Sequence, residues 1–268
     1  MQVWGVINVT PDSFSDGGRF SDLAAAVLHA RRLIAEGADV LDVGGESTRP
    51  GAEPVGEDLE IARVVPLIRA IRAESAIPIS VDTMKPAVAR AAVAAGATIW
   101  NDVTALRHAP ESLATAAELG CEVVLMHMQG EPRTMQAEPR YDDVAAEVAA
   151  FLAARAEAAT GAGVVRERIC LDPGVGFGKH STRHNLPLLA GLDRIVALGF
   201  PVLLGVSRKR FIDAVDGGGH GPAERLGGSI AGALWGARAG VAAVRAHDVR
   251  ETVQALAVWA AIAGADRG

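Results

Sequence analysis

The strongest constraint on the fold is a short apolar run that recurs eight times along the chain, with a longer stretch between one run and the next. Short apolar runs without regular polar alternation are typical of parallel strands buried on both faces. The predicted strands span residues 3–8, 39–43, 77–82, 98–102, 122–127, 168–172, 201–206 and 243–247. Dividing 268 residues by eight gives about 33 residues per unit, which is close to the βα repeat of a TIM barrel.

The stretches between the strands are rich in alanine and predict the crossover helices that parallel strands require. Helical periodicity is clearest over residues 22–37, 57–74, 85–96 and 142–163. Several of these stretches end at a glycine just before the next strand, as in EGADV, AGATI and AGVAAV, which is the pattern of a helix C-cap. A glycine cluster at 216–221 predicts a mobile loop between a short helix and a long helix that begins near Glu224.

Polar residues at the strand ends distinguish two α/β architectures. An open, doubly wound sheet collects its ligands at one switch point, whereas a closed barrel builds its site from all of its loops. One aspartate at a strand end is often only a helix cap. Here the polar residues recur at almost every strand end: Asn8, Asp42, Asp82, Asn101, Asp102, His127, Asp172, Ser207, Lys209, Arg245 and His247. We therefore expect a single (β/α)8 barrel domain over residues 1–268, with its active site at the C-terminal ends of the strands.

Composition limits the class of partner. The formal net charge of −6 argues against nucleic acid or a membrane surface as partner, because such proteins carry wide basic patches. An anionic small molecule needs only a local positive cluster, and SRKR at 207–210 provides one. Cys121 and Cys170 adjoin apolar runs, so we expect two packed, reduced thiols. The N-terminal segment has no secretion signal and no membrane-spanning apolar run, and we expect a cytoplasmic protein.

Two loops are longer than the two to six residues that usually join a strand to a helix in α/β units. The first, NVTPDSFSDGGRF, covers 8–20, and the second, GGESTRPGAEP, covers 44–54. Proline and glycine prevent helix formation in both. Arg49 in the second loop is suited to binding a phosphate or carboxylate through paired donors. Their length predicts flexible loops of an active site.

Eight segments carry a specific resemblance. The two most distinctive are GVINVTPDSFSDGG (5–18) and LDVGGESTRPGA (41–52). The shorter ones are SVDTMKPAVA (80–89), NDV (101–103), VLMHMQGEPRTMQ (124–136), LDPGVGFGK (171–179), GVSRKRF (205–211) and VRAHDV (244–249). In order and spacing, this set resembles the motifs of the dihydropteroate synthases, which are pterin-binding enzymes of folate biosynthesis. The resemblance implies a transferase that joins 6-hydroxymethyl-7,8-dihydropterin pyrophosphate to p-aminobenzoate and releases pyrophosphate.

Carried over position by position, the resemblance implies a pterin site made of Asp82, Asn101, Val103, Met126, Asp172, Phe177, Lys209 and Arg245. The residue types suit this ligand. A carboxylate such as Asp172 can accept two adjacent N–H groups of the pterin, and the flat guanidinium of Arg245 can stack on its ring. The resemblance further implies a p-aminobenzoate site made of Phe14, Thr48, Arg49, Pro50, Phe177, Lys209 and Arg210.

The leaving pyrophosphate is expected, again by resemblance, at Asn8, Thr48, Arg49, Arg245 and His247, with Mg²⁺ near Asn8. Mg²⁺ keeps its waters and binds largely through substrate phosphate, so a dense carboxylate cage is not required. The seven histidines lack HxH or HExxH spacing, so zinc is not expected, and His127 is expected to be packed.

The catalytic set implied by the resemblance is Asp16, Arg49, Lys209, Arg245 and His247. We expect dissociative substitution, in which C–O cleavage leaves a delocalised pterin cation that Asp16 stabilises and the amine then attacks. The sequence offers no evident protein nucleophile. Family resemblance also implies sulfonamides as competitive inhibitors and a homodimer.

Two other functions are considered. A methyltetrahydrofolate:corrinoid methyltransferase has a similar pterin-binding barrel but should lack the TPDSFSDGG and ESTRPG loops and the SRKR cluster. A non-catalytic pterin-binding protein would bind pterin without releasing pyrophosphate.

Overall fold

A computed structural model describes residues 1–9, 18–47, 53–131 and 134–265. All eight predicted strands are confirmed to within about two residues at each end. They are β1 (Gln2–Asn8), β2 (Val40–Gly44), β3 (Ile79–Asp82), β4 (Ile99–Asp102), β5 (Glu122–Met126), β6 (Ile169–Asp172), β7 (Leu203–Gly205) and β8 (Ala243–Ala246). Every pairing between them is parallel.

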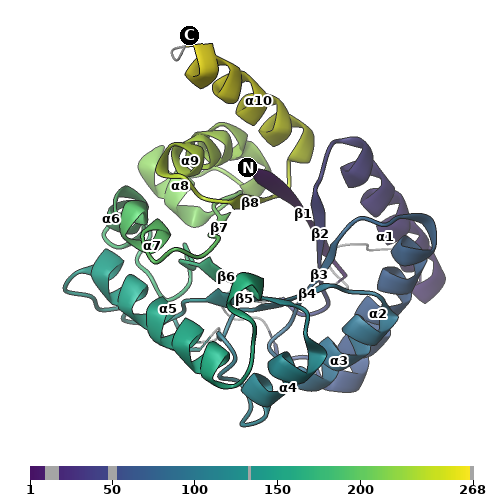
Figure 1. The fold of residues 1–268 in the computed structure, drawn as a ribbon. Helices are drawn as coiled ribbons and strands as arrows, with labels where there is room; N and C mark the ends of the chain where they lie inside the picture. The colour runs from purple at the N-terminus through teal and green to yellow at the C-terminus, as the bar shows by residue number, and fades with distance from the viewer. Residues whose placement is uncertain (10–17, 48–52, 132–133, 266–268) are drawn as a thin grey trace.

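The sheet is nearly closed. Its strand order is β6-β5-β4-β3-β2-β1-β8-β7, and the two outer strands meet through a parallel bridge between Leu171 and Val202. The backbone N–H of Leu171 also donates to the carbonyl of Pro201 at 2.9 Å. Seen along its axis, the barrel has the strands at its centre and the helices around them (Figure 1). The predicted (β/α)8 barrel is therefore confirmed, and the open-sheet alternative is excluded.

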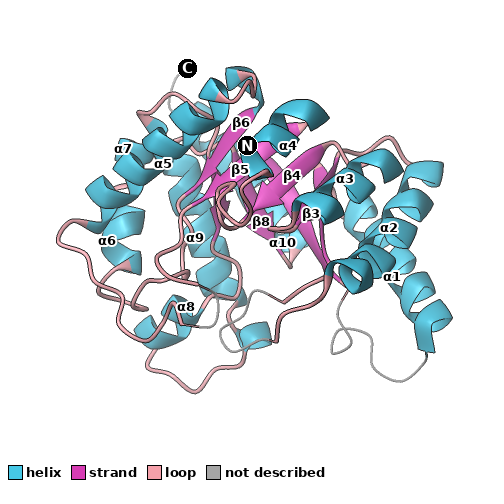
Figure 2. Ribbon diagram, turned by 90° about the horizontal axis from the view of Figure 1, so that it is seen from below, coloured by secondary structure: helices cyan, strands magenta, loops and turns pink. Residues whose placement is uncertain are grey.

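Helices enclose the strands, and the long connections after β6 and β7 lie together at one end of the barrel (Figure 2). The helices are α1 (Gly18–Ala35), α2 (Glu57–Glu74), α3 (Pro86–Ala95), α4 (Ser112–Leu119), α5 (Val144–Gly161), α6 (Asn185–Ala190), α7 (Leu192–Val196), α8 (Arg210–Val215), α9 (Leu226–Ala239) and α10 (Val249–Ala265). Gly37, Gly96 and Gly240 have the positive φ values of 97°, 118° and 86° that a left-handed cap requires, so the predicted helix ends are confirmed. None of the described helices is long and apolar enough to cross a membrane.

Successive side chains along each strand point to opposite faces of the sheet, and this alternation produces two apolar layers. One cluster, which includes Leu41, Val81, Trp100, Leu125 and Val244, packs against the helices. A separate cluster is formed by the intervening residues of six strands and by the half-buried Cys170: Trp4, Val40, Ile99, Val124, Leu203 and Ala243. Because side chains alternate with period two, this second cluster fills the barrel interior. Two residues further along, the inward positions of β2, β4 and β8 are the polar residues Asp42, Asn101 and Arg245, and the site begins there.

A buried ionic cluster fixes the C-terminal ends of β2 and β3. The ammonium of Lys85 lies 2.6 Å from the carboxylate of Glu46 and 2.5 Å from that of Glu60, whose side chain is fully buried. Glu46 also accepts a hydrogen bond from the backbone N–H of Val55 at 2.9 Å. The guanidinium of Arg63 donates to the carbonyl of Gly45 at 2.7 Å. These bonds hold the described ends of the second long loop against α2.

We predict that Lys85→Met lowers the free energy of unfolding by about 3–5 kcal/mol, because removal of one partner leaves buried carboxylates uncompensated. The measurement is urea denaturation at neutral pH. The control is Arg31→Met, which breaks a pair with Glu74 whose side chains are 56% and 44% exposed; because solvent screens this pair, the loss should be much smaller than in Lys85→Met. Equal losses in the two variants would contradict the prediction.

Candidate active site

A pocket opens at the C-terminal end of the barrel, directly above the apolar interior cluster. Strand ends and the loops after β6 and β7 supply its walls. Its lining residues are Val6, Asp82, Asn101, Val103, Met126, Asp172, Gly174, Val175, Phe177, Gly205, Ser207, Lys209, Arg245 and His247.

Arg245 connects three strands at the base of this pocket. Its Nε donates to Asp42 on β2, and its Nη2 donates to Asp82 on β3 at 2.7 Å. Asn101 on β4 joins the same group, because its Nδ2 lies 3.4 Å from both carboxylate oxygens of Asp42. Asp42 is fully buried, so the guanidinium and the amide replace the water that its carboxylate has lost.

Asp82 is only partly satisfied by these contacts. Its Oδ1 is buried and accepts no hydrogen bond from the part of the chain that the structure describes. The pKa of Asp82 is raised to about 7; burial is the main cause, the charge of Arg245 opposes it, and the nearby charge of Asp42 adds to it. An unpaired acceptor at a pocket wall is a place where a ligand N–H can bind.

Asp172 occupies the end of β6 and turns the chain into the next loop. Its Oδ1 accepts a hydrogen bond from the backbone N–H of Gly174 at 2.7 Å. Gly174 has a φ of +65°, and a Cβ there would lie 1.9 Å from the carbonyl oxygen of His127. Burial raises the pKa of Asp172, while its hydrogen bond from Gly174 and the charge of Lys209 act in the opposite direction.

Lys209 and Phe177 meet at the rim of the pocket. The Lys209 ammonium lies 4.2 Å from the centre of the Phe177 ring, within the range of a cation–π contact. Burial lowers the pKa of Lys209 to about 8, and Asp172 counteracts this by favouring the charged form. An apolar ring with a cation above it suits a flat, polar heterocycle.

The tautomer of His247 is set by Ser207. The backbone N–H of His247 donates to Ser207 Oγ at 3.2 Å, and Oγ lies 3.0 Å from His247 Nδ1. Ser207 is buried, and Nδ1 is the acceptor that the described residues offer to its hydroxyl proton, so we infer that the hydroxyl donates to Nδ1 and that the ring proton is on Nε2. Burial, together with the charges of Arg245 and Arg208, lowers the pKa of His247 to about 3.

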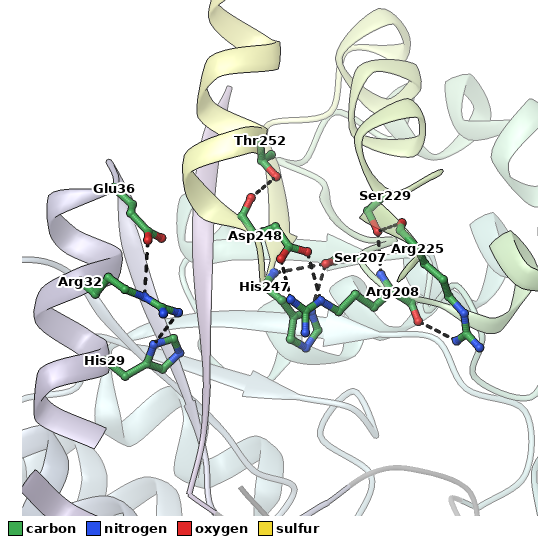
Figure 3. A network of polar contacts seen from close by, with 10 residues as sticks. All are labelled: His29, Arg32, Glu36, Ser207, Arg208, Arg225, Ser229, His247, Asp248 and Thr252. Carbon is green, nitrogen blue, oxygen red and sulfur yellow. Dashed lines mark hydrogen bonds and ion pairs between the residues drawn. The ribbon is translucent and has the colours of Figure 1, made fainter. Parts of the chain in front are cut away.

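An ion pair joins the β7 loop to the start of α10, as Figure 3 shows. The guanidinium of Arg208 binds Asp248 through two bonds, at 3.0 Å and 2.5 Å. Arg208 has a φ of +59°, which is rare for a residue with a side chain. Its backbone N–H donates to Ser229 Oγ at 2.9 Å, and its carbonyl accepts from Arg225 at 3.1 Å. These contacts hold in place the chain neighbours of Arg208 and Asp248, which are Ser207, Lys209 and His247.

Nine of the residues expected at the site lie together around the pocket: Asp82, Asn101, Val103, Met126, Asp172, Phe177, Lys209, Arg245 and His247. Asn8 at the end of β1 is half-buried, and Arg210 is exposed at the first residue of α8; neither lines the pocket. Phe14, Asp16, Thr48, Arg49 and Pro50 lie outside the described residues.

The sequence interpretation did not assign Asp42 and Ser207 to the site, although it noted both as polar strand ends. Asp42 holds Arg245, and Ser207 holds His247. Both are polar residues at the C-terminal ends of strands, and this position was the sequence feature that could have assigned them to the site. The expectation that His127 is packed is confirmed, because its ring lies edge-on to Phe151 with centroids 4.8 Å apart. Cys121 and Cys170 are free thiols, as expected.

Asn8 offers a side-chain oxygen of the kind that Mg²⁺ binds. Among the described residues, no three histidines, cysteines or carboxylates cluster as a metal cage. Asn8 Oδ1 lies at the barrel mouth beside Gly44. One amide oxygen fits an ion that substrate phosphate and water hold for the most part.

Comparison with known proteins gives a consistent result. A model of the pterin binding enzyme family matches residues 4–247. The dihydropteroate synthase of Escherichia coli strain K12 is 48% identical over 256 residues, which cover 96% of this chain and 89% of the relative.

Solved structures agree with the sequence relatives. A dihydropteroate synthase from Xanthomonas albilineans with 4-aminobenzoic acid has a TM-score of 0.91 and 52% identity, covering 97% of this chain and 92% of that one. The Yersinia pestis dihydropteroate synthase in a sulfonamide drug complex has a TM-score of 0.92 and 42% identity, covering 98% and 94%.

We predict that His247 stays neutral, with its proton on Nε2, from about pH 5 to about pH 8, because its pKa lies at about 3. Long-range proton–nitrogen NMR of the imidazole ring measures both its charge and its tautomer. In Ser207→Ala the proton should distribute over the two ring nitrogens. Titration of His247 close to the ordinary pKa of about 6.5 would contradict the prediction.

Proposed function

The chain belongs to the pterin-binding enzyme family, among its dihydropteroate synthases, and we propose how its residues divide the work of that reaction. The enzyme is a transferase of folate biosynthesis that joins a dihydropterin pyrophosphate to p-aminobenzoate. The observation that carries the assignment of residues is the cluster of Asp82, Asn101, Asp172, Lys209 and Arg245 around one pocket.

In this proposal the pterin ring lies above the barrel interior. Asp172 accepts the exocyclic amine and the adjacent ring N–H, and the unpaired Oδ1 of Asp82 accepts a further N–H. Lys209 donates to the ring carbonyl, and Phe177 and Met126 supply apolar contacts. A ligand without matching hydrogen-bonding groups would leave these buried donors and acceptors of the pocket unpaired. Such a ligand is therefore disfavoured.

Pyrophosphate is proposed to bind on the β8 side. Arg245 provides a fixed positive charge, and the Nε2–H of the neutral His247 donates a hydrogen bond. Asn8 would hold Mg²⁺, which supplies charge neutralisation of the pyrophosphate oxygens when bound. Thr48 and Arg49 are proposed as further pyrophosphate contacts.

The chemistry proposed is dissociative substitution. The C–O bond to pyrophosphate breaks with its electron pair going to the leaving oxygen, and the amine of p-aminobenzoate then attacks the pterin methylene and loses a proton. Ser207 is engaged with the backbone and ring of His247, so we assign it to orientation and not to attack. The protein therefore contributes binding, orientation and charge stabilisation.

The second substrate is proposed to bind between Phe177, Lys209 and Arg210 and the two long loops. Phe14, Thr48, Arg49 and Pro50 are assigned to it by resemblance, and Asp16 to the cationic intermediate. The Xanthomonas relative with 4-aminobenzoic acid and the Yersinia relative with a sulfonamide support this site and competitive inhibition by sulfonamides. Two free thiols support a cytoplasmic location, and one sheet supports one domain over residues 1–268.

We also propose a homodimer through α9 and α10. These helices pack against each other, and in Figure 1 the C-terminal half of α10 projects beyond the ring of helices. Val258 and Ile262 lie four residues apart on α10, hence on one face, and are 55% and 68% exposed. Trp235 on α9 is 41% exposed. Exposed apolar residues on two adjacent helices favour a self-complementary interface.

The function is tested by mixing the pterin pyrophosphate, p-aminobenzoate and Mg²⁺ with the enzyme. Release of pyrophosphate that depends on p-aminobenzoate is expected. Pterin binding without release would indicate a non-catalytic protein, and methyl transfer from methyltetrahydrofolate would indicate the corrinoid enzyme.

We predict that Asp172→Asn lowers kcat/KM for the pterin substrate by about 10- to 100-fold, because one charged acceptor of two ligand N–H groups is lost. Steady-state kinetics measure the change. Asp102→Asn is the matched control, because the Asp102 carboxylate accepts from Thr104 and Leu106 within its own loop. That variant should lose stability and keep its KM. If Asp172→Asn behaves like this control, the assignment is wrong.

We predict that Ile262→Asp converts the dimer to a monomer, since a buried unpaired carboxylate disfavours the interface. Light scattering after size exclusion measures the mass. Leu28→Asp is the control, because Leu28 is a comparably exposed leucine, at 61%, on α1, a helix that the proposed interface does not include. A wild-type monomer, or a dimer in both variants, would refute the interface.

A further inference from the structure

Lys179 is a buried lysine that the proposed reaction does not use. Its relative exposure is 1%, and it is one of the largest fully buried side chains in the protein. A buried ammonium is ordinarily neutralised by a carboxylate. Here no carboxylate oxygen within 4.0 Å of Lys179 Nζ belongs to the described residues; its hydrogen-bond partners are three backbone carbonyls and one histidine.

These partners belong to the loop after β6 and to the strand end beside it. Lys179 Nζ lies 2.9 Å from the carbonyl oxygen of Gly174 and 3.0 Å from that of Phe177. It also lies 2.8 Å from His127 Nδ1 and 3.4 Å from the His127 carbonyl. The loop 174–179 therefore folds around the side-chain amine of Lys179, its last residue.

The loop lies so close to the β5 end that glycine is required at two points. A Cβ on Gly174 would lie 1.9 Å from His127 O, and one on Gly178 would lie 2.2 Å from Gln129 O. Both glycines have positive φ, and because glycine has no side chain it leaves this segment many alternative conformations when no bonds hold it. Specific bonds are needed to select one of them, and Lys179 supplies bonds to both ends of the Gly174–Phe177 turn.

We propose that Lys179 is a positioning residue, which sets the conformation of the loop 174–179 and so places Phe177 against the substrates. The proposal rests on the function proposed above, in which Phe177 contacts pterin and p-aminobenzoate. Lys179 donates to the carbonyl of Phe177, and the ring of Phe177 lies 4.2 Å from the ammonium of Lys209.

The two carbonyl bonds do not require a charged lysine. As an ammonium, Lys179 can donate to Gly174, to Phe177 and to the unprotonated Nδ1 of His127. As a neutral amine, it can still donate to both carbonyls and accept from a protonated Nδ1. His127 can supply either tautomer, because burial lowers its pKa to about 3 and keeps the ring neutral. The arrangement therefore holds the loop in both protonation states of Lys179.

The main test is Lys179→Met, which keeps the apolar stem and removes the donors. We expect the KM for p-aminobenzoate to rise about tenfold, because buried carbonyls lose their partner and the turn relaxes. The affinity for inorganic pyrophosphate, which depends on Arg245 and His247, should stay unchanged by calorimetry. Lys179→Gln retains two donors and should recover part of the loss.

A double-mutant cycle with Phe177→Leu tests whether Lys179 acts through Phe177. In the Phe177→Leu background, Lys179→Met should change the KM by less than about threefold. Tyr141→Phe is the control, since it removes a 2.8 Å bond to the Gly178 carbonyl of the same loop and leaves the amine in place. It should have a smaller effect than Lys179→Met.

If Lys179→Met weakened the binding of p-aminobenzoate and of pyrophosphate equally, Lys179 would have a general structural role and the proposal would be overturned. An unchanged KM for p-aminobenzoate in Lys179→Met would also overturn it. So would a double variant whose KM increase equals the product of the increases in the two single variants, because the two residues would then act independently. Failure of the proposed function is separate, because it appears in the wild-type enzyme as absent turnover.

The wild-type protein also provides a measurement that needs no folded variant. The chain has three lysines, Lys85, Lys179 and Lys209, so nitrogen-15 labelling of lysine gives a simple side-chain spectrum. The Lys179 amine, identified by its proximity to Phe177, should exchange its protons slowly with water. Rapid exchange would overturn the proposal even if Lys179→Met does not fold.

Discussion

The active site depends on charge buried inside the barrel. Asp42, Asp82 and Asp172 lie almost out of solvent at the C-terminal strand ends, and carboxylates there are stable only when cations or donors replace water. Arg245 does this for Asp42 and Asp82, because one guanidinium bonds to both. Among the described residues the replacement is incomplete: Oδ1 of Asp82 is buried and has no hydrogen-bond partner there, and the pKa of this carboxyl is raised to about 7. A ligand that brings N–H groups can donate to these carboxylates, so recognition of such a ligand follows from the electrostatics of the barrel itself.

That cluster can exist because of how the strands alternate. The inward positions of β2 and β8 change from Val40 and Ala243 to Asp42 and Arg245 in a single step of two residues. The apolar side chains below exclude water and form a rigid base, and the charged ones above form the binding surface. The outward positions of β2 and β8 remain apolar along the strand and pack against the helices. One sequence pattern therefore specifies both the stability of the barrel and the location of its chemistry.

The sequence predicted the strands well because buried parallel strands are nearly continuous apolar runs. The helices α6 and α7 were not predicted, since six and five residues are too few to show a helical period. The helix α9 was predicted to begin near Glu224 but begins at Leu226. Residues Pro222–Glu224 form a separate 3-10 turn instead, in which the Glu224 carboxylate accepts a hydrogen bond from the backbone N–H of Gly221. The pocket residues came from resemblance. The bond between Arg245 and Asp42 spans 203 positions and arises only when the barrel closes, so no local pattern could have predicted it.

The three lysines show how the chain separates positioning from binding. The other 23 of its 26 basic residues are arginines, and all three lysines lie at or beneath the barrel mouth. A lysine ends in a compact amine with several donors, which fits where a planar guanidinium would not. Lys85 draws two carboxylates together, Lys179 draws two carbonyls together, and Lys209 faces the ligand pocket over Phe177. Two of the three therefore act on the protein itself. The placement of the third depends on Lys179, because the Phe177 ring beneath Lys209 belongs to the loop that Lys179 holds.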